Sequence, residues 1–324
     1  MRVLITGGAG FIGSHLAERH LRRGDEVAVL DDLSTGDYNN IHHLEPNPRF
    51  NIKVGTILES DTLRPLVEWC DTIYHLAAAV GVNYIIDNPL HSLTTNIRGT
   101  EIVLELANKD KKRVMLASTS EVYGKKNGKV SFQENDDRLL GPITVDRWIY
   151  STTKAVDEML GLSYWREKKL PMLIVRFFNV IGPRQTGDYG MVVPRMVKQA
   201  LLGHPITVYG DGEQRRCFTD IEDALDGLVA LAEHPDTPGE IFNLGGNVET
   251  NETSIVKLAH KVKALTESDA PIEFVPYDKA FAKGSYEDLN YRVPDLSKIR
   301  SFVNYEPKMS LDNTLRRIIN YFES

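Results

Sequence analysis

Three glycines near the start of the chain, Gly7, Gly10 and Gly13, stand between a short apolar run and a helix-forming segment. The apolar run Arg2–Thr6 predicts a strand, and Ser14–Arg23 predicts a helix. Glycines at this spacing let a backbone approach a pyrophosphate, and the N-terminus of the helix offers N–H donors and positive dipole charge. A strand, a glycine turn and a helix in this order therefore predict a dinucleotide-binding unit in a parallel sheet.

A carboxylate follows where such a unit needs one. The next predicted strand, Glu26–Leu30, is followed by Asp31, eighteen positions after Gly13. A carboxylate there accepts hydrogen bonds from the ribose hydroxyls of an adenosine and repels a 2′-phosphate. We therefore expect NAD, and not NADP, as the cofactor.

Short strands and helices alternate through the first half of the chain. Further strands are expected at Phe50–Val54, Thr72–Leu76, Arg113–Ala117 and Pro171–Phe177, and helices at Leu63–Trp69, Leu90–Ala107 and Ser151–Glu167. This alternation predicts an α/β fold, a doubly wound parallel sheet of the Rossmann type with helices on both faces.

The pattern becomes mixed after Gly182-Pro183. Helices are expected at Val192–Leu202, Ile221–Ala232, Ser254–Leu265 and Leu311–Phe322, strands at Ile206–Tyr209 and Glu240–Leu244, and no clear periodicity at Asp269–Gly284. We expect residues 1–179 and 220–246 to form the NAD-binding domain, and residues 180–219 and 247–324 to form a smaller mixed α/β lobe that binds the substrate.

The composition argues against several other classes of protein. A net charge of −7 and a pI near 5.8 argue against nucleic acid or an anionic membrane as a partner. No apolar run approaches the roughly 18 residues that span a membrane, and no leader is expected. The nine histidines show no metal-ligand spacing, and the two cysteines, Cys70 and Cys217, indicate a reducing compartment. We expect a cytoplasmic protein without a metal.

A second local pattern places Tyr150 and Lys154 four residues apart, on one face of a helix. An ammonium beside a phenol favours the phenolate, so we expect Lys154 to lower the pKa of Tyr150 from about 10. Such a tyrosine takes a proton from a sugar hydroxyl while a hydride leaves the same carbon. This spacing alone is common by chance, so other motifs must support it.

Several longer motifs occur in one order along nearly the whole chain. They are Thr6-Gly7-Gly8-Ala9-Gly10-Phe11-Ile12-Gly13, His75-Leu76-Ala77-Ala78, Asn96, the Tyr150/Lys154 pair, and Arg176-Phe177-Phe178-Asn179-Val180-Ile181-Gly182-Pro183. In this combination the sequence closely resembles the extended short-chain dehydrogenases, which are nucleotide-sugar epimerases, dehydratases and decarboxylases.

The resemblance implies a set of cofactor contacts. They would come from Gly7, Gly10, Phe11, Ile12, Gly13, Asp31, Leu76, Ala77, Ala78, Asn96, Ser118, Tyr150, Lys154, Phe177 and Val180. One departure from the family is Thr56, where many relatives place an aspartate near the adenine. That departure affects one adenine contact and leaves NAD as the expected cofactor.

The resemblance also implies a nucleotide-sugar site, with uridine as the expected base. Arg216 would reach the diphosphate, as a guanidinium suits phosphate oxygens. Asn179 would bond the diphosphate or the sugar, and Val193 and Tyr209 would flank the base. The structural alternatives are an ion pair of Arg216 with Glu213 or Asp220, and turn formation and ordinary packing for Asn179 and Tyr209.

The reaction depends on the stretch that begins at Thr119. By resemblance, Thr119 bonds the C4 hydroxyl of the sugar while that carbon is oxidised to a ketone. Dehydratases of the family carry an Asp-Glu pair at the next two positions, whereas this chain has Ser120 and Glu121. Epimerases usually have a small or hydroxyl residue in place of Glu121. Thr-Ser-Glu resembles the decarboxylases of UDP-glucuronate.

Two further stretches resemble nucleotide-sugar decarboxylases. They are Arg147-Trp148-Ile149-Tyr150-Ser151 and Gly284-Ser285-Tyr286-Glu287-Asp288-Leu289-Asn290-Tyr291-Arg292-Val293-Pro294. Arg292 is thereby expected near the reacting sugar, to bind the carboxylate or to donate a proton after carbon dioxide is lost. The alternative for Arg292 is a phosphate-positioning or interdomain role, and for Glu121 a hydrogen bond to a loop.

The leading hypothesis is therefore a UDP-glucuronate decarboxylase that works through a 4-keto intermediate. The alternatives are a UDP-sugar 4-epimerase (of UDP-glucose/galactose or UDP-glucuronate), a 4,6-dehydratase, an ordinary dehydrogenase and a non-catalytic NAD sensor. Relatives pair the helices that correspond to Leu90–Ala107 and Ser151–Glu167 into a four-helix bundle. On that resemblance we expect a homodimer.

Overall fold

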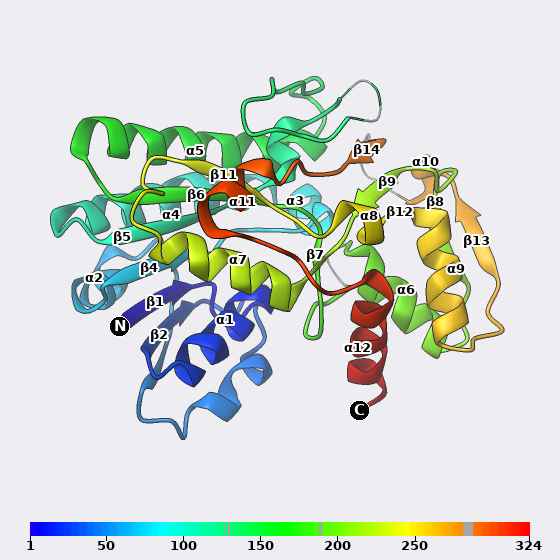
Figure 1. Ribbon diagram of the computed structural model, residues 1–324, viewed down its shortest axis with the longest axis horizontal. Coiled ribbons are helices and arrows are strands. Elements are labelled where there is room, and N and C mark those ends of the chain that lie inside the picture. The colour runs from blue at the N-terminus through cyan, green and yellow to red at the C-terminus, as the bar shows by residue number, and fades with distance from the viewer. Residues whose placement is uncertain (127, 129, 188–189, 281–287) are drawn as a thin grey trace.

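The computed structural model describes residues 1–126, 128, 130–187, 190–280 and 288–324. Within these residues, seven parallel strands form the central sheet in the order β11-β6-β5-β4-β1-β2-β3 (Figure 1). The strands are β1 (Arg2–Thr6), β2 (Glu26–Asp31), β3 (Phe50–Val54), β4 (Thr72–His75), β5 (Arg113–Thr119), β6 (Met172–Phe177) and β11 (Ile241–Leu244). The expected doubly wound α/β fold is confirmed.

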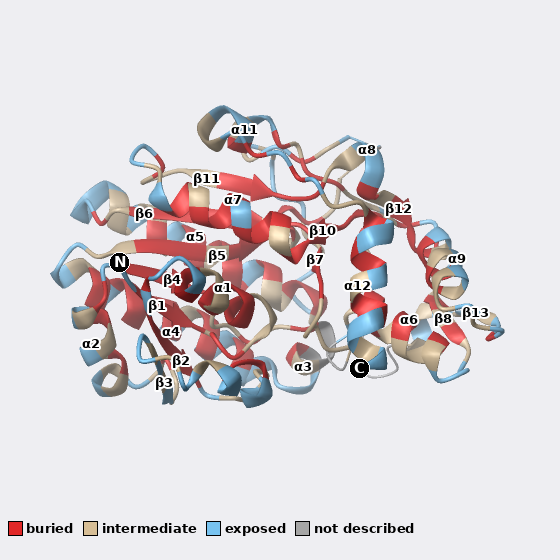
Figure 2. Cartoon of the chain, turned by 60° about the horizontal axis from the view of Figure 1, so that its bottom comes forward, coloured by how far each residue is buried: buried red, intermediate tan, exposed pale blue. Residues whose placement is uncertain are grey.

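Helices cover both faces of this sheet because successive side chains of each strand point to opposite sides. Val3 and Ile5 of β1 enter the core under one set of helices, while Leu4 enters the core under the other. The first set is α1 (Phe11–Arg22), α7 (Ile221–Glu233) and α11 (Ser297–Val303), and the second is α2 (Ser60–Trp69), α4 (Pro89–Lys109) and α5 (Arg147–Lys168). Six of the seven strands are accordingly buried through most of their length, whereas the edge strand β3 is half-buried or exposed (Figure 2).

A second group of elements has a hydrophobic core of its own at one end of the sheet (Figure 1). It contains α6 (Val192–Leu201), α9 (Ile255–Leu265) and α12 (Leu311–Glu323), with β8 (Ile206–Tyr209) paired to β13 (Ile272–Val275). Two short parallel strands, β7 (Val180–Ile181) and β10 (Thr219–Asp220), pair with each other where the chain crosses the expected boundary between the NAD-binding domain and the smaller lobe. Leu296, Ile299 and Tyr305 belong to the segment expected in the smaller lobe, but they pack in the hydrophobic core between the central sheet and α1, α7 and α11. The division into two lobes stays a proposal.

A small sheet that the sequence pattern did not predict joins three distant segments. Its strands are β12 (Glu252–Ser254), β9 (Arg215–Cys217) and β14 (Tyr291–Arg292), in that order. In its register Arg292 lies opposite Arg216. The small sheet thus brings side by side two arginines that are 76 positions apart in the sequence.

The remaining short elements are the helices α3 (Val82–Asp87), α8 (Val248–Asn251) and α10 (Tyr277–Ala280) and the 3-10 turns η1 (Tyr38–Asn40), η2 (His42–Leu44) and η3 (Ser120–Tyr123).

Three helices begin three or four residues earlier than the sequence pattern predicted, and one of them is α2, which starts at Ser60. Helix α1 starts at Phe11, after the extended backbone of Gly10, and α5 starts at Arg147. The earlier start of α5 places Arg147, Tyr150 and Lys154 on one face, because residues three and four apart are neighbours on a helix. β13 lies in the stretch Asp269–Gly284, where no periodicity was found. None of the helices that the structure describes has the length and apolar composition needed to cross a bilayer.

Candidate active site

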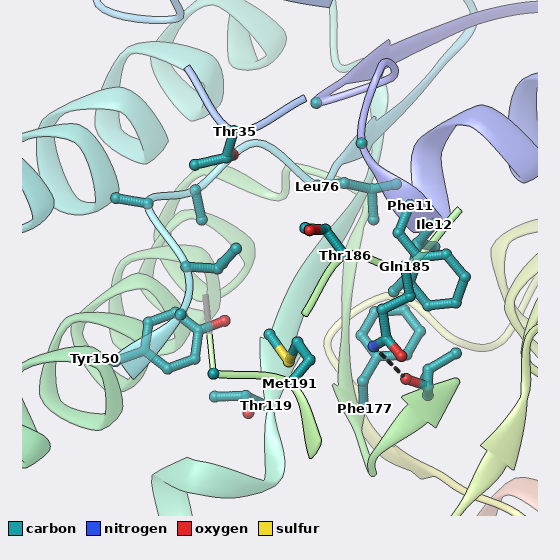
Figure 3. A pocket seen from close by; sticks show the side chains of 18 of the residues that line it. Phe11, Ile12, Thr35, Leu76, Thr119, Tyr150, Phe177, Gln185, Thr186 and Met191 are labelled. Atoms are coloured by element: carbon teal, nitrogen blue, oxygen red, sulfur yellow. Dashed lines mark hydrogen bonds between the residues drawn. The ribbon is translucent and has the colours of Figure 1, made fainter. Parts of the chain in front are cut away.

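A cavity of about 730 Å³ runs from the glycine turn after β1 to the second group of elements. It opens over the carboxyl ends of the strands, where parallel α/β sheets bind their ligands. Phe11, Ile12, Leu76, Phe177, Thr119 and Tyr150 are among the side chains that surround it in Figure 3. The other expected residues on its wall are Gly7, Gly10, Gly13, Asp31, Ala77, Ala78, Ser118, Ser120, Glu121, Lys154, Asn179, Val180, Val193, Tyr209, Arg216 and Arg292.

Of the three glycines at the 7, 10 and 13 spacing, two are closely packed. Gly7 has a φ of +75°, and a Cβ there would lie 2.7 Å from the backbone nitrogen of Ala77. A Cβ on Gly13 would overlap the carbonyl oxygen of Gly7. At Gly10 the nearest atom to such a Cβ is 3.3 Å away. Close packing thus requires glycine at Gly7 and Gly13, and the turn presents bare backbone to the cavity.

Asp31 is held against this turn by backbone donors. Its Oδ2 accepts from the nitrogen of Ala9 at 2.8 Å, and its Oδ1 accepts from the nitrogen of Leu33 at 2.9 Å. Burial raises the pKa of Asp31, and these hydrogen bonds act against that rise. A Cβ on Gly36 would lie 2.8 Å from Asp31 Oδ1, so the loop also packs tightly around the carboxylate.

Asn96 differs from its expected place. Its buried side chain lies behind the described wall of the cavity, where Oδ1 accepts from the nitrogen of Ala79 at 2.7 Å. Its Nδ2 donates to Thr153 Oγ1 at 3.2 Å and to the carbonyl of Ala79 at 3.3 Å. Asn96 therefore fixes the loop after β4 to α5, and it acts on the cavity through that loop. Of the Val54–Ile57 stretch, Gly55 and Ile57 line the cavity.

The electrostatics of Tyr150 also differ from expectation. Burial, Glu121 and Asp157 raise the pKa of Tyr150, whereas Arg292 lowers it. The expected neighbour, Lys154, donates instead to Asp157 Oδ2 at 2.9 Å, and both side chains are buried. The prediction that Lys154 lowers the pKa of Tyr150 is therefore wrong for this structure, because a carboxylate one turn further along α5 holds the ammonium.

Glu121 lies between two arginines. Arg147 Nη1 is 2.5 Å from Glu121 Oε2, and Arg292 Nη1 donates to Oε1 of the same carboxylate. Burial opposes the negative charge, but Arg147 and Arg292 outweigh it and hold the pKa of Glu121 at about 2. The other arm of Arg292 donates to Oδ1 of Asn179, whose φ is +41°. Glu121 is thus an ionised carboxylate bridged by two guanidinium groups.

Thr119 and Ser120 precede this carboxylate at the carboxyl end of β5. Thr119 Oγ1 accepts from the nitrogen of Glu121 at 3.2 Å, so its side chain caps η3. Ser118 donates to Glu158 Oε1 at 2.5 Å, and Arg176 binds both oxygens of Glu158. The end of β5 is therefore held in place by a buried ion pair behind the site.

Arg216 is paired with a different acid from the two that the sequence suggested. Its Nη2 donates to Asp288 Oδ1 at 2.7 Å, and its Nη1 donates to the carbonyl of Leu289 at 2.5 Å. Asp220 pairs instead with Arg317 at 2.9 Å. Of the resembling stretch that contains Arg292, residues Gly284–Glu287 lie outside the described residues.

Further along the cavity, the guanidinium of Arg195 lies 4.0 Å from the centre of the Tyr209 ring. Val193 is fully buried at the start of α6, and both it and Tyr209 line the cavity. This end carries Arg195, Lys198 and Arg216, whereas the end near the glycine turn carries Asp31, Asp32 and Asp37. The cavity is therefore acidic at one end and cationic at the other.

Sequence reasoning missed Arg147, Asp157 and Asp288 as members of the site. Arg147 stands three residues before Tyr150 and Asp157 three residues after Lys154, so helical spacing was the signal that would have found both. Asp288 has no comparable local signal, because its pairing with Arg216 depends on the small sheet.

Comparisons with known proteins agree with this geometry. Residues 3–245 match the model of the NAD dependent epimerase/dehydratase family. A UDP-N-acetyl-alpha-D-glucosaminuronate decarboxylase from Bacillus cytotoxicus is 40% identical over 99% of this chain and 97% of that protein. UDP-glucuronic acid decarboxylase 1 from Arabidopsis thaliana is 38% identical over 100% of this chain and 70% of that protein.

Among solved structures, the UDP-glucuronic acid 4-epimerase from Bacillus cereus, in complex with UDP-glucuronic acid and NAD, has a TM-score of 0.86. It is 33% identical and covers 100% of this chain and 99% of that one. These likenesses extend over the cavity and the whole sheet. They confirm the expected family, an enzyme, and NAD as the cofactor. The chain belongs to the NAD dependent epimerase/dehydratase family.

Proposed function

We propose that this enzyme removes carbon dioxide from a UDP-linked hexuronate, with UDP-glucuronate as the lead substrate. The observation that carries the proposal is the pair of guanidinium groups of Arg147 and Arg292 around Glu121, close to Tyr150 on the cavity wall. Two relatives at 40% and 38% identity are named as decarboxylases of UDP-linked uronates, which supports the same class of substrate.

The residues present fit NAD. Gly7 and Gly13 leave no room for side chains and expose backbone at the N-terminus of α1, where a pyrophosphate is stabilised. Asp31 stands at the adenosine end, where its carboxylate is suited to ribose hydroxyls. Leu76, Phe177 and Val180 supply an apolar wall further in. When bound, NAD takes a hydride from a substrate carbon and returns one later in the cycle.

The cationic end of the cavity suits a substrate with three anionic groups. A guanidinium binds phosphate oxygens well, and Arg216 and Arg195 are both on the wall. Arg292 lies opposite Arg216 in the small sheet, nearer to Glu121 and Tyr150. We propose that Arg216 binds the diphosphate, that Val193 and Tyr209 flank the uracil, and that Arg292 binds the sugar carboxylate.

The proposed chemistry begins at C4 of the sugar. Tyr150 takes the proton of the C4 hydroxyl, and Thr119 bonds the same oxygen. Because burial raises the pKa of Tyr150, its phenolate would need the positive charge of a bound nicotinamide to favour it. Lys154 would hold the nicotinamide ribose. The resulting C4 ketone is β to the C6 carboxylate, so it accepts the electron pair that the C5–C6 bond leaves when carbon dioxide departs. C5 then takes a proton, and Tyr150 returns its proton to the C4 oxygen.

The structure constrains the role of Glu121 in this scheme. Because Arg147 and Arg292 hold its pKa at about 2, Glu121 is an anion at working pH and has no proton to donate. We propose that Ser120 orients the reacting carboxylate and that Glu121 holds Arg292 in the site until the substrate binds. Arg292 remains the candidate for binding the carboxylate or delivering the C5 proton.

Incubation with NAD and a panel of UDP-glucuronate, UDP-N-acetylglucosaminuronate and UDP-glucose tests the proposal. Proton NMR and mass spectrometry should show loss of one carbon dioxide from a uronate and no net product from UDP-glucose. Tyr150→Phe should abolish turnover while NAD binding is kept. A uronate that keeps its mass would contradict the proposal.

A 4-epimerase is the second candidate, because the Bacillus cereus UDP-glucuronic acid 4-epimerase has the same fold over the whole chain. The same panel separates the two, since epimerisation inverts the C4 signal without loss of mass. Glu121→Gln is expected to slow decarboxylation far more than epimerisation.

We also propose a homodimer that pairs α4 and α5 across a two-fold axis into a four-helix bundle. Leu90 on α4 and Met159 on α5 are 76% and 58% exposed, which suits a face covered by a second copy. Light scattering tests this, and a monomer would contradict it.

The cytoplasm stays the proposed compartment. Cys70 and Cys217 are both free thiols and both buried, which is typical of proteins in a reducing compartment.

A further inference from the structure

The two arginines that bind Glu121 differ in how they are held. Arg147 stands in the first turn of α5, and its side chain is 4% exposed. Arg292 stands on the short edge strand β14, and its side chain is 16% exposed and also bonded to Asn179. Both line the cavity. Arg147 is therefore the more enclosed partner of Glu121, and Arg292 is the partner that faces the ligand space from the substrate lobe.

Among the described residues, Glu121 is bridged by two guanidinium groups, whereas the neighbouring cations each have an acid of their own. Lys154 is paired with Asp157, and Arg216 is paired with Asp288, so each of these pairs is neutral. Arg147 and Arg292 share the single carboxylate of Glu121. An unpaired buried charge is strongly unfavourable, so Glu121 must keep at least one guanidinium at all times. With Arg147 in place, Arg292 can leave Glu121 without stranding a buried anion.

We propose that Arg147 is a specificity-determining positioning residue, which holds Glu121 so that Arg292 can exchange Glu121 for the carboxylate of an incoming sugar acid. This inference rests on the proposed function. In a chain without Arg147, Arg292 would be the remaining ion-pair partner of Glu121 among the described residues. The site would then lose its preference for a uronate over a neutral hexose, while the diphosphate contacts of Arg216 stayed as they are.

The test is calorimetric binding of UDP-glucuronate, UDP-glucose and UDP to the NAD-loaded full chain. The wild type should bind UDP-glucuronate more tightly than UDP-glucose. Arg147→Gln should reduce that ratio by about tenfold or more, while its affinity for UDP changes less than about twofold. A merely structural role would weaken all three ligands alike, so the ratio distinguishes the two roles.

A second test uses the double variant Glu121→Gln with Arg147→Gln. It has no carboxylate at position 121 that needs a counter-ion, so it also serves if the single variant fails to fold. It should bind UDP-glucuronate at least as tightly as the wild type, because Arg292 no longer has an anionic competitor. Weaker binding by the double variant would overturn the inference.

The outcomes also separate this inference from the proposed function. A wild type without a preference for UDP-glucuronate would overturn the proposed substrate class and the role of Arg147 with it. A wild type with the preference, together with an Arg147→Gln protein that keeps it, would overturn the role of Arg147 alone and leave the proposed function standing.

Discussion

The Nζ atom of Lys154 lies 2.9 Å from Oδ2 of Asp157, one turn further along α5, and both side chains are buried. Asp157 is itself among the charges that raise the pKa of Tyr150, after burial and Glu121. The lysine of the Tyr150/Lys154 pair is thus balanced by an acid within the same helix. The strength of Tyr150 as a base therefore depends on the carboxylate of Asp157, which raises its pKa.

Asp157→Asn should therefore move the pH dependence of turnover. Removing a nearby negative charge lowers the pKa of the Tyr150 phenol, so the phenolate forms at lower pH. Because the proposed reaction needs the phenolate, the acidic limb of the kcat/KM profile should shift toward lower pH. Breaking the buried pair should also cost about 3–5 kcal/mol of stability, measured by urea unfolding. An acidic limb that stays in place, in a protein that is destabilised as expected, would contradict the coupling between Asp157 and Tyr150.

Local patterns predicted the parts of the fold that depend on neighbouring residues. The glycine turn and the alternating strands follow from apolar runs and spacing, and all seven expected sheet strands are present within a residue or two of their predicted ends. The cavity wall near Gly7, Asp31 and Leu76 follows from the same local signals.

The electrostatic partners required tertiary information. β14 is two residues long, and its place beside β9 depends on a chain crossing that no local pattern encodes. Glu121 and Arg147 are 26 positions apart, and they meet because η3 and the start of α5 pack together. The predicted effect of Lys154 on the pKa of Tyr150 was wrong for a different reason, since a residue type and a spacing do not say which of two neighbours an ammonium will face.

His75 makes the stability of the fold sensitive to mild acid. Burial, and to a lesser extent Lys154, lower the pKa of His75 to about 3, and its ring bonds Thr6 Oγ1 at 2.7 Å and Thr100 Oγ1 at 3.1 Å. The unfolded chain takes up a proton on this histidine near pH 6.5, whereas the native protein does not until about pH 3. The stability contributed by neutral His75 is therefore complete above pH 6.5 and is lost progressively as the pH falls.

The measurement is urea unfolding of the wild type and His75→Gln at pH 7 and at pH 5. The wild type should be the more stable at pH 7, and its advantage should shrink by about 2 kcal/mol at pH 5. His42→Gln, at an exposed position, is the matched control and should show no such change. An advantage that stays constant between the two pH values would contradict the assignment.

The glycine turn allows a comparison of two neighbouring glycines. In Gly13→Ala the new methyl group would overlap the Gly7 carbonyl and lie 2.6 Å from Gly8 Cα, so unfolding should become easier by roughly 1–3 kcal/mol. In Gly10→Ala the nearest atom is 3.3 Å away, so thermal stability should change far less. Scanning calorimetry of the two proteins without added NAD checks this. Equal losses of stability would show that close packing is not what requires glycine at Gly13.

Arg216 and its neighbour Arg215 offer a matched pair for the substrate site, because successive side chains of a strand point to opposite faces. Arg216 lines the cavity, whereas Arg215 pairs with Glu252 at 2.6 Å and is not among the described lining residues. A charge-assisted contact to phosphate contributes about 1.5–3 kcal/mol, so Arg216→Met should weaken UDP binding by at least about tenfold. Arg215→Met removes the same charge from the same strand, and UDP affinity should change by less than about twofold. Equal losses in calorimetric titrations with UDP would mean that the general positive charge of β9, and not a contact from Arg216, attracts the diphosphate.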